Sequence, residues 1–564
     1  MKRVTYIITV LLTILVWVIN LSAQMVEYNH PELDWLTIET DHFQVHYHEG
    51  AERTAALVAK IAEEIYWPIT SLYLYEPDGK IHFIIRDHDD FSNGITYYYD
   101  NKIEIWATPM DFVLRGNHNW LRNVVTHEFT HMISLGAARK ITRKIPAFYF
   151  QYMGYEPEKN PYVLYGFPNR IVSYPLAMTT VPNWLAEGVA QYQLAKLNYD
   201  NWDSHRDMIL RTAVLEREIL NHREMGVFGK NSLNNEKVYN HGFALVKYIA
   251  DTYGVEALRR IFRDLQSPLH FTVNDALKKV LGKSERQLYK EWKNYLEEMY
   301  AYRVGTIKNH ISKGKIIQEK GFANLFPIWS PDGNKFAFIS NRGHDYLSQS
   351  SLYIHDMVTG TTEKIKGGVN SSISWAPDGQ KIVYARKSKP NKHGSHFVNI
   401  YMYDLKKKKE RPITRDLRAL SPDWSPDGKK LLLVTTKDGT QNIAVFDLKS
   451  KKLNYLTHFK EGQQIFTPRW SPNRQFIVFS FTKGEGRQLR LITADSKSLN
   501  VLLADRNDAR DPIFSPNGKE VYFSWDQTGI FNIYSINIST KEKKQLTNVV
   551  GGAFMPSVNK KGQL

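Results

Sequence analysis

Three side chains in the segment Thr126–His131 could bind a metal ion and use it for hydrolysis. The segment reads Thr-His-Glu-Phe-Thr-His, which is an HExxH pattern. On a helix, His127 and His131 lie one turn apart, so both imidazoles project from one face toward a single ion. Glu128 lies beside that face, where its carboxylate could take a proton from a water activated by the metal. The pattern predicts a zinc site, Zn²⁺ being the expected cofactor, with Glu128 as a catalytic general base.

A catalytic zinc needs a third protein ligand and an open position. The chain has no cysteine, which excludes thiolate ligands, thiol catalysis and disulfides, and no third histidine follows at the spacing HExxHxxGxxH. Glu187 is the best candidate, because it lies in a predicted helix that is otherwise lined by apolar residues. An unpaired carboxylate there would be costly, and zinc ligation would remove that cost. The alternative is that Glu187 is an exposed helix residue. Gly188 is expected to let this helix approach the HExxH helix closely.

The elements around these residues predict an α+β domain. Residues 35–48, 80–87 and 101–109 have the composition of strands, and residues 52–69 carry apolar residues at helical spacing. From residue 120 onward the pattern is mainly helical. Three further helices are expected within residues 240–254, 273–282 and 284–303, the first two ended by a glycine.

The segments His127–His131 and Asn183–Tyr192 resemble the gluzincin peptidases, in particular the peptidase MA-like domains of exported bacterial proteins. The resemblance rests on HEFTH followed by NWLAEGVAQY and extends loosely over residues 36–300. It implies that His127, His131 and Glu187 bind zinc and that Glu128 is the general base. The 55 residues between His131 and Glu187 exceed the interval of the aminopeptidase branch, which leaves the substrate preference open.

Two further residues are candidates for stabilising an oxyanion opposite the metal. Related domains carry a tyrosine-rich segment where this chain reads Val238-Tyr239-Asn240-His241-Gly242, so Tyr239 or His241 could donate a hydrogen bond to a tetrahedral intermediate. A capping or packing role is the alternative for each. Gln191, one turn after Glu187, is a candidate partner for a ligating histidine.

The insert at residues 145–176, between the two predicted metal-binding helices, is rich in aromatic residues. It could be a lid over the cleft, a hydrophobic docking hairpin, or an insertion packed on the core. The sequence does not choose between them.

From residue 321 onward an internal repeat replaces this pattern. Trp-Ser-Pro-Asp-Gly and its variants recur with aromatic residues at positions 329, 375, 424, 470 and 514, at intervals of 46, 49, 46 and 44 residues. Each copy is followed by a run typical of strands. A period in the mid-forties with several strands per unit is typical of β-propeller blades. The Pro-Asp-Gly is expected to form a hairpin turn, and the preceding aromatic residue to pack between blades. The repeat closely resembles that of the TolB family.

The predicted organisation is a multidomain chain, an α+β zincin-like metallopeptidase domain followed by an all-β propeller of about six blades. The boundaries are a signal peptide at 1–23, the peptidase domain at 24–305, a linker at 306–320 and the propeller at 321–564. The segment Met555–Leu564 reads as a sixth, degenerate repeat whose second strand is missing. We expect this blade to be completed by chain beyond residue 564; completion by the segment near residue 315 is the alternative.

The net charge of +16 is carried entirely by residues 321–564, because residues 1–320 contain equal numbers of acidic and basic residues. Charge confined to one half favours contact with an anionic surface, or mere solubility, over nucleic acid binding. The run Lys406–Lys409 with Arg411 is expected at a solvated hairpin tip. It could contact an anionic polymer of the cell envelope, and an envelope protein is another candidate partner of the propeller.

The N-terminus has the layout of a secretory signal peptide. Lys2 and Arg3 precede an uncharged apolar stretch that ends at Ala23, where cleavage is expected. An uncleaved anchor is the alternative, since this stretch is just long enough to span a membrane. We therefore expect the protein to be extracytoplasmic: periplasmic, associated with the outer envelope, or secreted. Any membrane contact would come through this segment or through further chain at the C-terminus.

These features predict an exported zinc metallopeptidase that acts on a peptide or protein substrate, with the propeller recruiting or restricting that substrate. The alternative is a non-catalytic envelope scaffold in which the propeller is the functional module. The presence of Glu128 favours the enzyme, because a site without activity has little reason to keep the general base. The substrate, and endo- or exopeptidase action, remain open.

Overall fold

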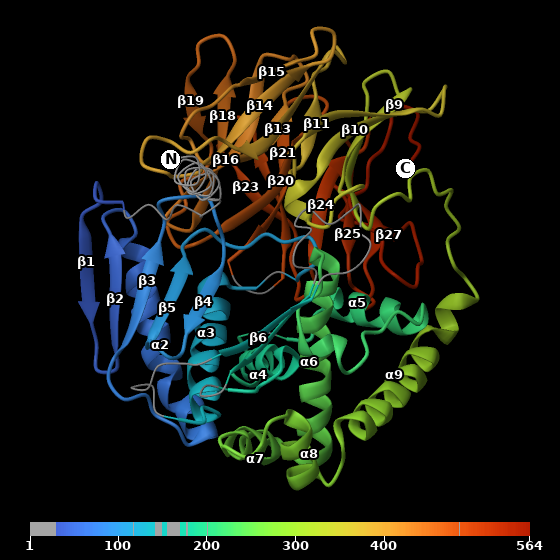
Figure 1. Cartoon of the computed structure of the whole chain (residues 1–564). Coiled ribbons are helices and arrows are strands. Elements are labelled where there is room, and N and C mark those ends of the chain that lie inside the picture. The colour runs from blue at the N-terminus through green and yellow to red at the C-terminus, as the bar shows by residue number, and fades with distance from the viewer. Residues whose placement is uncertain are drawn as a thin grey trace, which may run out of the picture.

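The computed structural model describes residues 30–116, 118–141, 149–154, 170–175, 179–199, 201–483 and 486–564, with backbone only at 149–154 and 170–175. The predicted signal peptide lies outside these residues. The chain folds into an α+β domain and a β-propeller that lies above it in Figure 1. Among the helices described, none is both long enough and apolar enough to cross a membrane.

The first part of the α+β domain is a mixed five-stranded sheet with the order β1-β2-β3-β5-β4. The central strands β2, β3 and β5 run parallel, and the edge strands β1 and β4 run antiparallel to their neighbours. The strand bounds are β1 Trp35–Glu39, β2 Phe43–His48, β3 Ile81–Arg86, β4 Gly94–Tyr97 and β5 Lys102–Trp106. Alternate residues of the central strands are fully buried, which explains their strong strand signal.

The remaining elements of this domain are helices that pack against the sheet and against one another. Helices α2 and α3 cover the sheet, and the later helices form a bundle beside it (Figure 1). Their bounds are α2 Glu52–Tyr73, α3 Trp120–Ala137, α4 Asn183–Lys196, α5 Ser204–Leu215, α6 Ser232–Tyr253, α7 Val255–Leu265, α8 Val273–Leu281 and α9 Glu285–Lys308. The helices expected within 240–254, 273–282 and 284–303 are confirmed as parts of α6, α8 and α9, although α6 begins earlier, at Ser232, and α9 ends later, at Lys308. Gly254 and Gly282 follow the first two, as predicted.

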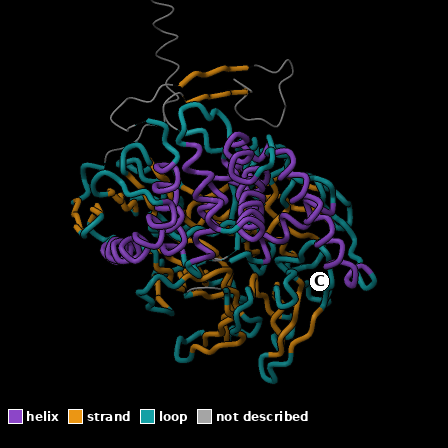
Figure 2. Tube along the Cα trace, turned by 90° about the horizontal axis from the view of Figure 1, so that it is seen from below, coloured by secondary structure: helices purple, strands orange, loops and turns teal. Residues whose placement is uncertain are grey.

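The aromatic insert contributes an antiparallel hairpin of β6 Tyr149–Gly154 and β7 Arg170–Pro175. Figure 2 shows these two strands apart from the other strands and helices. The choice between lid, docking hairpin and core insertion depends on side chains outside the described residues.

In the described part of the chain, the propeller consists of five four-stranded antiparallel sheets, each with its strands in sequence order. The first blade contains β8 Asn324–Trp329, β9 Lys335–Ser340, β10 Ser351–Asp356 and β11 Thr362–Gly367. The second contains β12 Ile373–Trp375, β13 Lys381–Lys387, β14 Val398–Asp404 and β15 Lys409–Pro412. The third contains β16 Ala419–Trp424, β17 Lys430–Lys437, β18 Thr440–Asp447 and β19 Leu453–Tyr455. The fourth contains β20 Gln464–Trp470, β21 Phe476–Thr482, β22 Gln488–Thr493 and β23 Leu499–Leu503. The fifth contains β24 Ala509–Phe514, β25 Glu520–Trp525, β26 Asn532–Asn537 and β27 Lys543–Gln545.

The repeat motif forms the turn between the first two strands of each blade, as predicted. Gly333, Gly379 and Gly428 adopt left-handed backbone angles with φ near +70°, which favours glycine there. The aromatic residue before the turn joins neighbouring blades. Trp375 packs with residues of the first blade, and its indole nitrogen donates to the carbonyl of Ile328 at 3.1 Å.

The sixth repeat forms no strand within the described residues. Its first residues lie against the first blade, where the backbone N–H of Trp329 donates to Ser557 Oγ at 3.3 Å. The described structure therefore contains five complete blades, where the sequence predicts about six with the last incomplete.

One face of the propeller contacts the α+β domain. The contacts come from the loops that join second to third strands and from those that join successive blades. Arg418, just before β16, pairs with Asp87 at 2.7 Å and with Asp90 at 2.6 Å. Asp438, in the turn between β17 and β18, accepts from the backbone N–H groups of Arg53 and Thr54 at the start of α2. Because strands in a blade alternate in direction, the turns between first and second and between third and fourth strands lie on the opposite face.

Candidate functional site

The HExxH segment lies on helix α3, as predicted. The side chain of Asn119 caps the helix by accepting from the backbone N–H of Arg122. Buried apolar residues of α3 pack against the sheet and helix α2, as Phe129 does with Phe43 and Tyr66, which leaves His127 and His131 together on the side toward α4. The Nε2 atoms of the two histidines are 3.0 Å apart.

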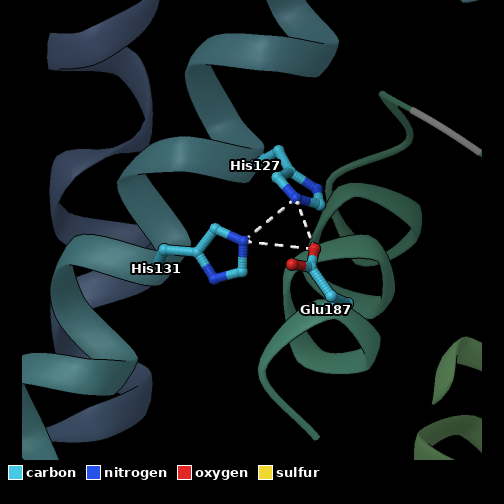
Figure 3. A group of neighbouring side chains, drawn as sticks. All are labelled: His127, His131 and Glu187. Carbon is cyan, nitrogen blue, oxygen red and sulfur yellow. Dashed lines mark hydrogen bonds and ion pairs between the residues drawn. The ribbon is translucent and has the colours of Figure 1, made fainter. Parts of the chain in front are cut away.

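Glu187 comes from the first turns of α4 and points at both imidazoles (Figure 3). Its Oε2 atom lies 3.1 Å from His127 Nε2 and 3.3 Å from His131 Nε2. In the described part of the chain, this is the one cluster of His, Asp and Glu side chains with the geometry to hold a metal ion. The three residues predicted as ligands from the sequence are therefore brought together by the fold.

The three atoms fit a tetrahedral zinc ion. Zinc bonds of 2.0–2.1 Å place neighbouring ligand atoms about 3.3 Å apart in a tetrahedron. The separations of 3.0–3.3 Å between these ligand atoms are close to that value. Two imidazoles and a carboxylate are also a donor set that zinc accepts. The site is thus the right size and the right chemistry for zinc, with one side open to the cleft.

The charges of the three predicted ligands depend on one another. Burial alone would raise the pKa of Glu187, but His131 and His127 hold it well below its usual range, so the carboxylate stays ionised. Burial alone would lower the pKa of His131, but Glu187 raises it above its usual value. The ionised carboxylate is the form that binds a cation.

Glu128 is held beside the cluster by the edge strand β4. Thr96 Oγ1 lies 2.8 Å from Glu128 Oε2 and 2.7 Å from the Glu128 carbonyl oxygen, and can donate to either. The strand approaches this closely because Gly94 has no side chain, since a Cβ atom there would lie 2.7 Å from Glu128 Cγ. Glu128 is 7% exposed. No sequence pattern predicts a role for Thr96 or Gly94, because only the pairing of β4 at the sheet edge brings them to α3.

A cleft of about 370 Å³ opens over these residues. Its walls come from β4, the loop between β5 and α3, helices α3 and α4, and Tyr239 of α6. Tyr239 lines this cleft, with its ring centroid 6.4 Å from that of His127. Burial, followed by the Glu187 carboxylate, raises the pKa of Tyr239, so its hydroxyl keeps a proton that it can donate.

His241 lies on the other side of α6. It is fully buried, its ring is 6.3 Å from that of Trp292, and it is not among the residues that line the cleft. Burial lowers its pKa to about 3. Side chains two positions apart on a helix point in directions that differ by about 200° around its axis. Only one of Tyr239 and His241 can therefore face the cleft. The structure therefore places Tyr239 beside the predicted metal ligands and keeps His241 away from them.

Two other expectations are modified. Gly188 packs against α6, where an added Cβ would overlap the carbonyl of Gly242, and not against the HExxH helix as expected. The reason is that the residue after Glu187 is rotated by about 100° around α4. Gln191 lines the cleft, but its Oε1 atom and His131 Nδ1 are both buried without a hydrogen-bond partner among the described residues.

Arg115 is a residue of the cleft that no sequence pattern predicts. Its Nε atom donates to both carboxylate oxygens of Glu236, at 2.9 and 3.0 Å, and its guanidinium lies 4.5 Å from the ring centroid of Tyr239. Lone arginines in loops carry no recognisable pattern. Only its position against Tyr239 indicates a part in the site.

The fold and the site show what class of protein this is: an α+β domain that carries an HExxH helix is joined to a β-propeller. Comparison with known families agrees. The Peptidase MA superfamily matches residues 170–298, and the TolB beta propeller domain matches residues 289–513. The chain therefore joins a peptidase MA superfamily segment to a TolB-type propeller, which confirms both resemblances. The peptidase segment includes Glu187 and Tyr239 and begins after His131.

Two similar proteins each match a part of the chain. Dipeptidyl-peptidase 5 from Porphyromonas gingivalis is 23% identical over 189 residues, which is 30% of this chain and 28% of that protein. The Tol-Pal system protein TolB from Ruthia magnifica subsp. Calyptogena magnifica is 37% identical over 83 residues, 15% of this chain and 19% of that protein. The chain thus spans less than a third of the length of these relatives.

Solved structures resemble part of the fold. TolB from Acinetobacter baumannii has 21% identity and a TM-score of 0.36, covering 42% of this chain and 57% of that chain. The putative TolB from Agrobacterium tumefaciens has 20% identity and a TM-score of 0.36, covering 41% of this chain and 83% of that chain.

Proposed function

We propose that this protein is an exported zinc-dependent peptidase of the gluzincin type. The observation that carries the proposal is the convergence of His127, His131 and Glu187 on one point, with their ligand atoms 3.0–3.3 Å apart and Glu128 beside them. The match to the Peptidase MA superfamily over residues 170–298 supports peptide-bond hydrolysis as the reaction. The signal-peptide pattern of residues 2–23 supports export.

The residues of the cleft have separate roles in this proposal. When bound, zinc supplies a Lewis acid that polarises a carbonyl and lowers the pKa of water to about 7. Glu128 accepts a proton from the attacking water on its carboxylate and passes it to the leaving amine. Thr96 orients that carboxylate through its hydroxyl. Tyr239 donates its hydroxyl proton in a hydrogen bond to the oxyanion that develops on the substrate.

The direct test is to measure zinc and peptide hydrolysis in the same preparations. We expect about one zinc per chain in the wild type and in Glu128→Gln, and none in His127→Ala. Hydrolysis of a peptide library should be lost in both variants. A folded wild type that takes up no zinc would contradict the proposal. Zinc in the wild type with no hydrolysis would favour the non-catalytic scaffold.

We also propose that the exposed propeller face binds an anionic polymer of the envelope. The turns between third and fourth strands lie on the face away from the α+β domain, and three of them place an exposed lysine in a left-handed backbone conformation: Lys408, Lys451 and Lys541, with φ between +51° and +62°. The first and fourth blades have Gly360 and Ser496 in the corresponding turns, with φ +70° and +59°. Three of the five turns therefore add a positive charge to this face, which favours an anionic partner.

Binding of dextran sulfate, with neutral dextran as the control polymer, tests this second proposal. The variant with Lys408, Lys451 and Lys541 each changed to glutamate should bind the anionic polymer several-fold more weakly, and added salt should weaken wild-type binding. Equal binding of the two polymers, or of the two proteins, would contradict it.

A further inference from the structure

The propeller contacts the segment that forms one wall of the catalytic cleft. We call residues 107–116, which follow β5, the cleft loop; it contributes Met110, Arg115 and Gly116 to the cleft. The loop lies against the propeller face described above. Two buried arginines of the propeller, Arg487 and Arg510, reach it from the fourth and fifth blades.

Each arginine bonds a different part of the cleft loop. Arg510 Nη2 donates to the backbone carbonyl of Arg115 at 3.3 Å. Arg487 Nη2 donates to Asp111 Oδ1 at 3.1 Å. The cleft loop is therefore bonded to the propeller in its middle and near its end.

Other buried contacts, from the propeller and from helix α5, hold the two arginine side chains in place. Arg510 Nε donates to Asp508 Oδ2 at 2.7 Å, and its Nη1 lies 3.4 Å from His205 Nε2 of helix α5. The guanidinium of Arg487 lies 3.5 Å from the ring centroid of Phe466. Both arginine side chains are 5% exposed or less, so water has little access to the guanidinium groups themselves.

From the cleft loop, contacts continue to Tyr239. The backbone carbonyl that Arg510 binds belongs to Arg115, whose guanidinium pairs with Glu236 and lies against the Tyr239 ring. Gly116, the next residue, packs so closely on Asp203 that an added Cβ would overlap its carboxylate. The loop has little room to shift without moving Arg115, and Arg115 is in contact with the residue that faces the metal ligands.

We propose that the propeller is a structural part of the catalytic cleft, with Arg510 and Arg487 as positioning residues that hold Arg115 and, through it, Tyr239. The inference rests on the proposed function and goes beyond substrate recruitment. A propeller that only recruits substrate could be loosened at this contact without changing turnover. A propeller that positions the cleft wall could not.

The test compares two losses of contact between the domains. Arg510→Ala removes the bond to the cleft loop. Asp438→Ala, the matched control, removes a contact of the same domains at the start of α2, outside the cleft loop. Arg510→Ala should lower kcat by about 10- to 100-fold with KM and zinc content nearly unchanged, because a small displacement of a catalytic group reduces turnover. Asp438→Ala should retain kcat within about twofold.

Asp111→Asn provides a second variant if Arg510→Ala does not fold. Asp111 is 55% exposed at its side chain, so the change creates no buried cavity, yet it weakens the bond from Arg487. We expect a smaller decrease in kcat, of about 2- to 5-fold. Unchanged kcat in both folded variants, or equal losses in Arg510→Ala and Asp438→Ala, would overturn the proposal.

Hydrogen exchange separates this proposal from the proposed function. Arg510→Ala should speed backbone exchange in residues 107–116 and around Tyr239, whereas Asp438→Ala should speed it at the start of α2. This exchange pattern can be measured whether or not the protein hydrolyses peptides. If the wild type does not hydrolyse peptides but the exchange pattern appears, the peptidase assignment fails while the positioning contact stands. If Arg510→Ala leaves exchange of the cleft loop unchanged, the positioning contact fails.

Discussion

Gly188 of α4 and Gly242 of α6 lie in direct contact where the two helices cross. A Cβ atom on Gly188 would overlap the Gly242 carbonyl, and a Cβ on Gly242 would overlap the Trp184 carbonyl. The residues proposed to act in the site are neighbours of these glycines, since Glu187 precedes Gly188 and Tyr239 lies three residues before Gly242. The closeness of the two backbones therefore sets how far Glu187, the proposed third metal ligand, lies from Tyr239.

Gly242→Ala should separate the two helices. The added methyl group meets backbone atoms, which cannot move aside as a flexible side chain can, so we expect destabilisation by about 3 kcal/mol and weaker zinc binding. Gly305→Ala is the control, because Gly305 is exposed on α9 with open space around its Cβ position. It should stabilise the protein by about 0.5–1 kcal/mol. Thermal unfolding and zinc content measure both. Gly242→Ala with unchanged stability would show that the contact is not needed.

Thr96→Val should impair turnover without affecting metal binding. The substitution keeps the shape of the side chain but removes the hydroxyl that bonds Glu128, so the carboxylate loses its orientation. We expect kcat to fall by about tenfold, with normal zinc content. Thr96→Ser keeps the hydroxyl and should retain most of the activity. If valine and serine variants have the same kcat, Thr96 does not act through Glu128.

Tyr239→Phe should decrease kcat more than it changes KM. The hydroxyl is proposed to act on charge that develops only during the reaction, and removing one such donor costs about 100-fold in kcat. Tyr248→Phe, on the same helix but outside the cleft residues, should leave kcat unchanged. Steady-state kinetics of the wild type and both variants, at equal zinc content, measure these changes in kcat and KM. A rise in KM alone would assign Tyr239 to substrate binding.

Zinc affinity should fall as the pH drops below neutrality. A histidine must lose its proton to bind the metal, and Glu187 raises the pKa of His131, so protons compete with zinc already at mildly acidic pH. Zinc should therefore bind more weakly at lower pH. Competition with a chelator between about pH 8 and about pH 5.5 measures it. Tyr239→Phe should follow the same pH dependence, and an affinity that does not change over this range would contradict the ligand assignment.

Local periodicity was enough to predict several features from the sequence. The spacing of His127 and His131 places both imidazoles on one helix face wherever that helix lies, because an α-helix repeats every 3.6 residues. The propeller repeat is likewise local, since each Trp-Ser-Pro-Asp-Gly copy specifies its own turn and each blade contacts mainly its neighbours. Both features follow from residues close together in the chain.

Tertiary structure decided which residues distant in the chain meet. Helical periodicity separates Tyr239 from His241 by about 200°, but only the packing of α6 against α4 selects Tyr239 for the cleft. Thr96 reaches Glu128 because β4 is the sheet edge beside α3. The contact between Arg510 and Arg115 spans 395 residues. Such contacts depend on how whole elements and domains pack, and no periodicity within the sequence encodes them.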